Sequence, residues 1–378
     1  MSSRDLVVFS HLRWDFVWQR PQHVISRLAR GRRTWFVEEP RPTSGRVPEL
    51  QMREEGPVTR VWMDVPSDAP HLNFGDPGTD CYIDALKEAL DVRPSPWVWL
   101  YTPLAFDMAT SMVPGVLIYD VMDDLASFRF ASDAMVLRQH QAIAHADVVF
   151  AGGRSLFEKA RRYNPERSYL FPSGVEPEHY IGARKHRHPH ARPVAGYVGV
   201  IDERLDLPLI AGLAARLPHW AIHMVGPVAK IDEHDLPRRC NIRYFGQRPY
   251  SELPRFMGGF DVALMPFALN EATRSISPTK TLEYLAAGLP VVSTRVPDVV
   301  ADYGDVVDLQ DDVDGFAAAC ERVLEHSLHD RDEKLRPLLA LHHWDSIVAR
   351  MEDTIANATR RSRAIVLPDE AAVGGSSA

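Results

Sequence analysis

The chain has 378 residues, of which 45% are hydrophobic and 25% charged, the balance of an ordinary globular protein. Because one domain takes roughly 100 to 200 residues, this length indicates two domains and excludes a single small module. The net charge of -8 argues against a dedicated nucleic-acid binder, so no nucleic-acid partner is expected.

Cysteine content and hydropathy predict a cytoplasmic protein. The 3 cysteines form no CxxC pair, so neither a disulfide framework nor a zinc knuckle is expected. The first apolar run, Leu6–Phe9, is too short for a secretory signal, and no run approaches the ~18 apolar residues that cross a bilayer. Membrane contact would therefore be peripheral, at the inner face of the cytoplasmic membrane. The basic residues that could serve it, or simply form a solvated helix end, are Arg27, Arg30, Arg32 and Arg33.

In the first half of the chain, short β-branched and aromatic runs alternate with stretches of helical period. Strands at this spacing indicate βαβ units, and near-continuously apolar strands are typical of a parallel sheet covered on both faces. We therefore predict a doubly wound, Rossmann-like α/β domain over residues 1–181. Its predicted strands are Leu6–Phe9, Thr34–Val37, Trp97–Tyr101, Val116–Tyr119 and Asp147–Ala151.

A polar stretch over residues 182–193, dense in His and Arg, reads as a linker, and a second alternation follows over residues 194–343. We predict a closing helix over 344–362 and a disordered tail over 363–378. Two doubly wound domains place the carboxyl ends of both sheets around an interdomain cleft, where ligands of such folds bind. The second set of strands is Val194–Val200, Ala221–Val225, Ile242–Phe245, Asp261–Phe267, Pro290–Ser293 and Asp305–Leu309.

Residues 277–288 carry the signals of a helix that presents its N-terminus to an anion. Ser277 is a capping residue, Pro278 suits the first helical position, and Gly288 ends the helix. Lys280 then lies in the first turn, where the helix dipole disfavours a cation unless an anion such as a phosphate is bound. Glu283, about one turn further on the same face, could accept hydrogen bonds from sugar hydroxyls. The alternative is a surface helix on which Lys280 and Glu283 merely pair.

The segment that continues from Glu283 resembles the C-terminal half of the retaining GT-B glycosyltransferases, which use nucleotide-sugar donors. Members of that family carry two glutamates separated by seven residues, then an Ala/Gly-rich helix end and Pro-Val-Val. Here Glu283 matches the second glutamate and is followed by Tyr-Leu-Ala-Ala-Gly-Leu-Pro-Val-Val, while Ser275 stands at the first position and Glu271 is a candidate replacement. A bacterial subgroup has a similar Ser-Pro-x-Lys before the glutamate. The donor-binding residues that the resemblance implies in this segment are Ser277, Thr279, Lys280, Thr281 and Glu283.

The opening of the second domain, Ala195–Asp206, looks like the glycine-rich first strand and loop of the same family. The resemblance implies that Gly199 approaches the donor and that Arg204 contacts its diphosphate. An arginine fork offers two N–H donors to phosphate oxygens and can stabilise a leaving diphosphate. The alternative is a tight strand-to-helix turn with a solvent-facing arginine. Because the GxGxxG fingerprint is absent from both halves, hydride transfer with NAD is not expected.

Polar residues also follow two strands of the first domain, at the ends that should face the cleft. After the first strand, the stretch His11–His23 packs aromatic rings and charges into one loop and resembles a Trp/Gln-Arg-Pro-Gln signature of the bacterial subgroup. The alternative is a helix N-terminus with Pro21 near its first position. The acceptor-site candidates in this loop are His11, Asp15, Gln19 and Arg20.

The strand Val116–Tyr119 is followed by a group of carboxylates, Asp120, Asp123 and Asp124, which are the candidate catalytic residues. Such a carboxylate could orient the acceptor hydroxyl or accept its proton, and Asp123 could replace a family histidine at whose place Met122 stands. The alternative is that Asp120 or Asp124 caps the following helix. The spacing fits a divalent-metal site poorly, so we expect no metal and no cofactor, with basic residues and helix N–H groups neutralising the diphosphate.

The resemblance covers most of the chain and implies a retaining glycosyltransferase of bacterial polysaccharide, glycolipid or glycoconjugate synthesis, which we expect to be metal-independent for the reasons just given. A nucleotide diphosphate sugar would bind the second domain, and the hydroxyl of a glycan, glycolipid or small-molecule acceptor would enter from the first. Closure of the cleft would exclude water. Two other interpretations stay open: a nucleotide-sugar epimerase on the same plan, and an inactive GT-B-like protein that binds glycans or acts as a scaffold.

Overall fold

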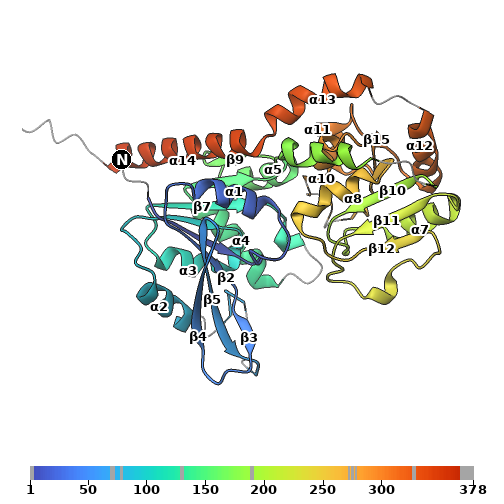
Figure 1. Cartoon of the computed structure of the whole chain (residues 1–378). Coiled ribbons are helices and arrows are strands. Elements are labelled where there is room, and N and C mark those ends of the chain that lie inside the picture. Colours follow the sequence, from blue (N-terminus) through green and yellow to red (C-terminus); the bar gives the residue numbers. More distant parts are fainter. Residues whose placement is uncertain are drawn as a thin grey trace, which may run out of the picture.

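The computed structural model of the chain describes residues 4–68, 73–76, 80–127, 132–187, 191–270, 273, 276, 279–325 and 329–366. Within these ranges the chain forms two α/β lobes that lie side by side (Figure 1). No helix in them is both long and apolar enough to cross a membrane.

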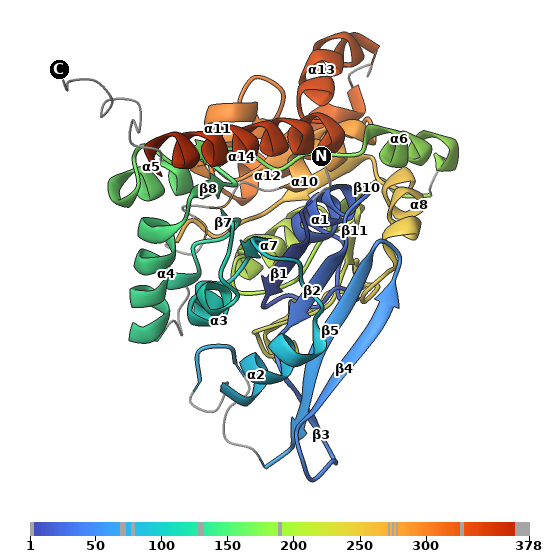
Figure 2. The same cartoon turned by 90° about the vertical axis from the view of Figure 1, so that its left-hand side faces the viewer.

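The first lobe is built on a sheet with nine strands in the described residues, in the order β3-β5-β2-β1-β6-β7-β8-β9, with β4 paired to β5. All pairs are parallel except β4 with β5, which form an antiparallel hairpin that points away from the body of the molecule (Figure 2). The strands are β1 (Leu6–Ser10), β2 (Thr34–Glu38), β3 (Arg41–Thr43), β4 (Glu49–Glu55), β5 (Val58–Pro66), β6 (Trp97–Leu100), β7 (Val116–Val121), β8 (Val148–Ala151) and β9 (Ser168–Leu170).

Helices cover both faces of this sheet, as its apolar strands require. In β1, Leu6 and Val8 belong to one hydrophobic core, and Val7 and Phe9 belong to the other. Because successive side chains of a strand point to opposite faces, the alternation shows that the sheet is buried on both sides. The helices are α1 (Arg20–Leu28), α2 (Asp80–Ala89), η1 (Pro103–Ala105), α3 (Phe106–Ser111), η2 (Leu125–Ser127), α4 (Asp133–His145) and α5 (Arg154–Tyr163).

The second lobe has a parallel sheet of six strands in the described part, in the order β12-β11-β10-β13-β14-β15. These are β10 (Val194–Val198), β11 (Ala221–Val225), β12 (Ile242–Tyr244), β13 (Val262–Met265), β14 (Val291–Ser293) and β15 (Asp308–Leu309). The helices of this half are α6 (Pro177–Tyr180), η3 (Ile181–His186), α7 (Leu207–Arg216), η4 (Glu233–Asp235), η5 (Tyr250–Glu252), α8 (Leu253–Gly258), α10 (Thr279–Ala286), α11 (Pro297–Tyr303), α12 (Val313–Glu325), α13 (His329–Leu341) and α14 (Trp344–Val366).

The fold class is that predicted, two doubly wound sheets, and each predicted strand is present within a few residues. Within the predicted linker, residues 182–193, the structure places part of η3, which packs on α8 and buries Ala183 to 1% exposure. Gly288 has a φ of 73° and Leu289 N donates to Tyr284 O, so a left-handed glycine ends α10 as expected.

Helix α14 returns to the first lobe, where it lies along α1 (Figure 1). Its buried side chains, among them Trp344, Met351 and Ile355, share a hydrophobic core with β1. Near the crossing, Val175 and His343 pair in a parallel bridge, so the two passages of the chain between the lobes lie beside one another.

The four arginines considered for membrane contact lie near acidic partners. Arg27 binds Glu176 and Asp345 at 2.6 Å, Arg33 binds Asp5 at 2.6 Å, and Arg32 pairs with Glu352. Arg30 is the most exposed of the four, at 68% of its side chain, and lies 3.7 Å from Asp345. Their charges are therefore largely balanced within the protein, and they form no free basic patch.

Candidate active site

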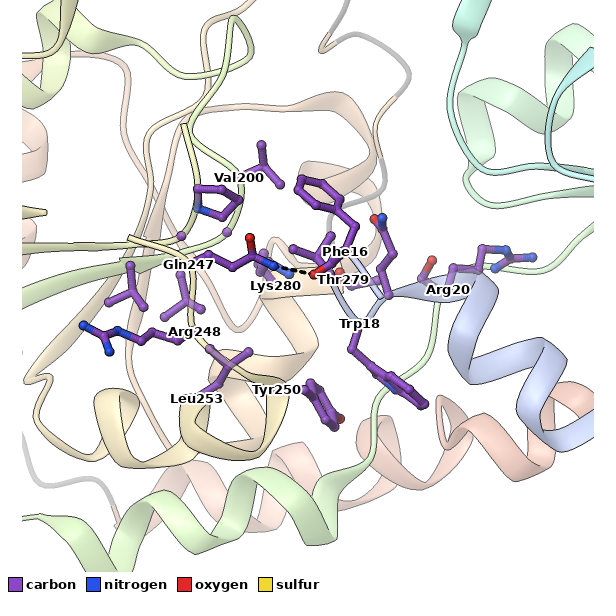
Figure 3. Close-up of a pocket in the computed structure, with 18 of the residues that line it drawn as sticks. Phe16, Trp18, Arg20, Val200, Gln247, Arg248, Tyr250, Leu253, Thr279 and Lys280 are labelled. Atoms are coloured by element: carbon purple, nitrogen blue, oxygen red, sulfur yellow. Dashed lines mark hydrogen bonds between the residues drawn. The ribbon is translucent and has the colours of Figure 1, made fainter. Parts of the chain in front are cut away.

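A cavity of about 710 Å³ lies between the carboxyl ends of the two sheets. The first lobe lines it with the loop after β1 and with Asp123 after β7. The second lobe lines it with the loops after β10, β11 and β12 and with the first residues of α10. Figure 3 shows these side chains converging from both lobes. The site is therefore where doubly wound folds bind ligands.

The start of α10 reaches the cavity through Thr279 and Lys280. Lys280 Nζ lies 3.3 Å from Glu283 Oε2, so the pairing considered from the sequence is present. Glu283 is 5% exposed and does not itself line the cavity. Its side chain thus lies next to the cavity wall, in contact with Lys280. Ser277, together with Ser275 and Glu271, lies outside the described residues.

Thr281 requires a correction. Its side chain is fully buried and its hydroxyl donates to Met265 Sδ at 3.3 Å, in the core between α10 and β13. Residues one position apart on a helix point about 100° apart, so Thr281 cannot share the cavity-facing side of Lys280. We remove Thr281 from the donor-binding set.

The loop after β10 brings Gly199 and Arg204 to the cavity. A Cβ atom on Gly199 would lie 2.7 Å from Tyr197 Oη and 3.1 Å from Lys280 Cε, so a side chain at this position would displace the Tyr197 hydroxyl and press on Lys280. The Arg204 guanidinium is held by Asp202, with Nη2 at 2.7 Å from Oδ2 and Nε at 3.0 Å from Oδ1. Although burial disfavours its charge, Asp202 and Asp123 raise the pKa of Arg204, which therefore stays a cation.

Asp123 is the carboxylate of the β7 group that lines the cavity. Its Oδ1 lies 4.0 Å from Arg204 Nη1, across the cleft, and its side chain is 20% exposed. Burial raises the pKa of Asp123, while Arg204 and Lys230 act in the opposite direction. A weakly acidic carboxyl beside a bound reactant can accept or hold a proton.

Asp120 and Asp124 require a second correction, because neither lines the cavity. Asp120 is fully buried, and its Oδ1 accepts from Arg20 Nη2 at 2.8 Å. Asp124 accepts from Gln139 at 3.1 Å and pairs with Lys159. Both carboxylates hold the fold together rather than face a reactant, so we remove them from the catalytic set.

The acceptor-site candidates of the first lobe are placed differently from one another. Asp15 and Gln19 line the cavity, and Asp15 is 51% exposed and held by Arg60 at 2.9 Å. Arg20 borders the cavity, but its guanidinium is 2% exposed and bound to Asp120, so it cannot reach an acceptor. His11 does not line the cavity, and burial, with the nearby charge of Lys230, lowers its pKa to about 4.

Aromatic residues of the cavity wall were not among the predicted site residues. Phe16 and Trp18 come from the loop after β1, and Tyr250 comes from the second lobe. Trp18 stacks on Tyr250 with ring centroids 5.9 Å apart, and Gln247 Nε2 donates to the Phe16 carbonyl, so this loop contacts both sides of the cleft (Figure 3). For the residues of the second lobe, the sequence did hold a signal: Gln247–Tyr250 follow a strand of the parallel sheet, and the loops at the carboxyl ends of such strands bind ligands.

Comparisons with known proteins agree with this geometry. The overall fold matches sucrose-phosphate synthase of Thermosynechococcus elongatus with a TM-score of 0.69 and 15% identity, over 96% of this chain and 100% of that one. It also matches HepE of Anabaena, solved with UDP and glucose, with a TM-score of 0.69 and 12% identity, over 94% of this chain and 100% of that one. Two Rossmann-like lobes around a cleft make this a GT-B fold.

Residues 192–326 match the family described as "Glycosyl transferases group 1". A related chain is TuaH of Bacillus subtilis (strain 168), named as a teichuronic acid biosynthesis glycosyltransferase, with 31% identity over 157 residues, 39% of this chain and 38% of TuaH. The similarity to group 1 glycosyltransferases therefore covers residues 192–326, most of the second lobe, and the chain matches about two fifths of the length of TuaH.

Acidic side chains near the site do not gather as metal ligands would. Among the described residues, no group of three or more His, Cys, Asp or Glu side chains is arranged to hold a metal ion. Asp123 instead faces Arg204, and Asp120 and Asp124 have their own partners away from the cavity.

Proposed function

We propose that this chain transfers a sugar from a nucleotide diphosphate sugar to an acceptor hydroxyl. The observation that carries the proposal is that two basic side chains, Arg204 and Lys280, line the cavity between the lobes, and both belong to the segment that matches group 1 glycosyltransferases. N–H groups aimed at a diphosphate stabilise the charge that it gains as the glycosidic bond breaks. Ser277, Thr279 and Glu283 complete the proposed donor contacts, with Gly199 leaving room for them.

Asp123 is the proposed group that orients the acceptor hydroxyl or takes its proton. It stands on the first lobe, opposite Arg204, so an acceptor bound there would meet the donor at the centre of the cleft. Asp15 and Gln19 are proposed acceptor contacts on the same wall. Because the N–H donors of Arg204 and the ammonium group of Lys280 can bind the diphosphate oxygens directly, the proposed reaction requires no metal ion.

The sequence resemblance to the retaining enzymes supports retention of configuration. The similarity to TuaH supports a role in polysaccharide, glycolipid or glycoconjugate synthesis. The acceptor would be a glycan, a glycolipid or a small molecule. We also propose a cytoplasmic location, since the exposed Cys240 forms no disulfide, a state that a reducing compartment preserves.

A donor panel tests the proposal. The purified protein is incubated with UDP-, GDP-, ADP- and dTDP-sugars, with and without an acceptor extract, and with and without EDTA. Chelator-insensitive transfer of the sugar is expected. Isomerised donor in place of transfer would identify an epimerase, and binding without turnover would identify an inactive glycan-binding or scaffold protein.

Lys280→Ala should weaken binding of the preferred nucleoside diphosphate about 10- to 100-fold, because a charge-assisted hydrogen bond contributes about 1.5–3 kcal/mol. Isothermal titration calorimetry measures this loss. Lys185→Ala, which changes an exposed lysine of η3, serves as the matched control and should bind as the wild type does. Unchanged affinity of Lys280→Ala would remove α10 from the donor site.

A further inference from the structure

Asp202 lies beside the proposed donor site without lining its cavity. It is 2% exposed, in the loop between β10 and α7. A carboxylate taken out of water in this way is costly unless its oxygens are hydrogen-bonded and its charge is balanced. The guanidinium of Arg204 provides both the hydrogen bonds and the opposite charge.

Both oxygens of Asp202 bind Arg204. Asp202 Oδ1 accepts from the Arg204 backbone N–H at 3.0 Å and from Nε at 3.0 Å, and Oδ2 accepts from Nη2 at 2.7 Å. One edge of the planar guanidinium is thus fixed by Asp202. The other edge carries Nη1, and this atom lies 4.0 Å from Asp123 across the cleft.

The loop backbone is fixed as well. Leu205 N donates to Asp202 O at 3.0 Å, and Ala268 N donates to Arg204 O at 2.9 Å. Asp206 then caps α7 by accepting from Leu209 N at 2.8 Å. With both its main chain and one guanidinium edge held, Arg204 can present its remaining N–H groups in a single orientation.

We propose that Asp202 is a positioning residue for diphosphate recognition: it holds one edge of Arg204 so that the opposite edge points into the cavity. This inference rests on the proposed function. The pair of Asp202 and Arg204 is close to neutral. Arg204 would therefore bind the diphosphate mainly through the direction of its N–H donors and less through net charge. Lys280 adds a second cationic side chain to the cavity wall.

If Asp202 acted only through its charge, Asp202→Asn would change the affinity for a nucleoside diphosphate in the opposite direction from that expected if Asp202 positions Arg204. Asp202→Asn removes a negative charge near an anion site, so charge alone predicts tighter binding of a nucleoside diphosphate. Loss of the fixed guanidinium edge predicts weaker binding. We expect a loss of about tenfold, measured by calorimetry with the nucleoside diphosphate that the wild type binds best among UDP, ADP, GDP, CDP and dTDP.

A double-mutant cycle shows whether Asp202 acts through Arg204. The variant Asp202→Asn/Arg204→Ala should bind the same nucleoside diphosphate no more weakly than Arg204→Ala alone, whereas a merely structural role would make the two losses add. Arg204→Lys keeps the charge but loses the fork, and it should lose as much affinity as Asp202→Asn. Asp206→Asn, in the same loop, is the control and should bind as the wild type does.

Tighter or unchanged binding by Asp202→Asn, additive losses in the double variant, or full affinity of Arg204→Lys would each overturn the positioning role. If Asp202→Asn does not fold, Asp202→Glu, which keeps the charge but moves the carboxylate by one methylene, takes its place in the same cycle and should also bind the nucleoside diphosphate more weakly. A wild-type chain that binds none of the five nucleoside diphosphates would instead overturn the proposed function, and this inference with it.

Discussion

The buried ion pair between Arg20 and Asp120 shows how one contact can change the interpretation of two residues. They are 100 positions apart and join the start of α1 to the end of β7, while Arg20 Nη1 also donates to the Phe171 carbonyl at 2.9 Å. From the sequence, each residue was a candidate for a functional role, because Asp120 lies at the carboxyl end of a strand and Arg20 lies in a polar loop. The sequence does not reveal a pairing over this separation.

Arg20→Ala and Asp120→Ala should each lower the free energy of unfolding by about 3–5 kcal/mol, since each leaves an uncompensated buried charge. The double variant Arg20→Met/Asp120→Leu, which removes both charges, should lose less than either single variant. Urea denaturation measures all three. A single variant with normal stability but no transferase activity would restore the functional interpretation of that residue.

The ionisation of Asp5 should make the free energy of unfolding depend on pH. Burial opposes its ionisation, but hydrogen bonds from Arg93 and Arg33 prevail and lower its pKa from 3.8 to about 2. A carboxyl with a lowered pKa stabilises the fold above its unfolded pKa, and this contribution is lost as the pH falls through the folded value. At pH 7, Asp5→Asn should therefore be less stable than the wild type by about 2 kcal/mol.

By pH 3 about half of this difference should be lost, because the unfolded state then binds a proton at residue 5 more readily than the folded state. Urea denaturation of both proteins at pH 7, 4 and 3 follows the change. A difference between the two proteins that stays constant over this range would exclude Asp5 as the titrating group.

Among the elements, the central strands of both parallel sheets were predicted, whereas β3, β4, β5 and β9 of the first sheet were not. Strands β1, β2 and β8 are buried throughout, so their residues carry the signal of a parallel sheet. Strand β4, by contrast, is largely exposed and reads Glu-Leu-Gln-Met-Arg-Glu-Glu, in which only Leu50 and Met52 alternate with polar residues, and it is held as a strand by pairing with β5. On α10, helical spacing did contain the signal that separates Thr281 from Lys280 and Glu283.

Helix α14 was predictable as an amphipathic element, but its partner was not. An apolar stripe on a helix indicates that this face is buried, but it does not indicate which hydrophobic core the helix packs against. The structure shows that the stripe packs on the first lobe, although α14 follows the second lobe in the chain. Its role is therefore to complete the core of the lobe where the chain begins.

Ile355→Ala should lower the free energy of unfolding by about 2–5 kcal/mol, because Ile355 is fully buried in the core of the first lobe. Asp353→Ala, an exposed change on the same helix, should stay within about 0.5 kcal/mol of the wild type. Thermal unfolding followed by circular dichroism compares them. Equal stability of the two variants would mean that α14 contributes little to this lobe.

At the scale of the whole molecule, the sequence indicated two sheets and a cleft, while the contacts that join the lobes came only from the structure. Ser155 Oγ donates to Asp298 Oδ1 at 2.8 Å, so a residue of the second lobe holds the start of α5. We propose that the domains divide within residues 182–193, with η3 fixed on the second lobe. Such pairings depend on how the lobes meet, which local patterns do not encode.

Because both lobes line the cavity, a bound nucleoside diphosphate should protect both from hydrogen exchange. Protection is expected in the loop after β10, residues 199–206, and also in the loop after β1, residues 11–19, whose Phe16 and Trp18 reach across the cleft. Exchange is followed by mass spectrometry at a ligand concentration about 100 times the Kd. Lys280→Ala at the same concentration should show much less protection in both loops, and protection confined to the second lobe would contradict a site shared between the two.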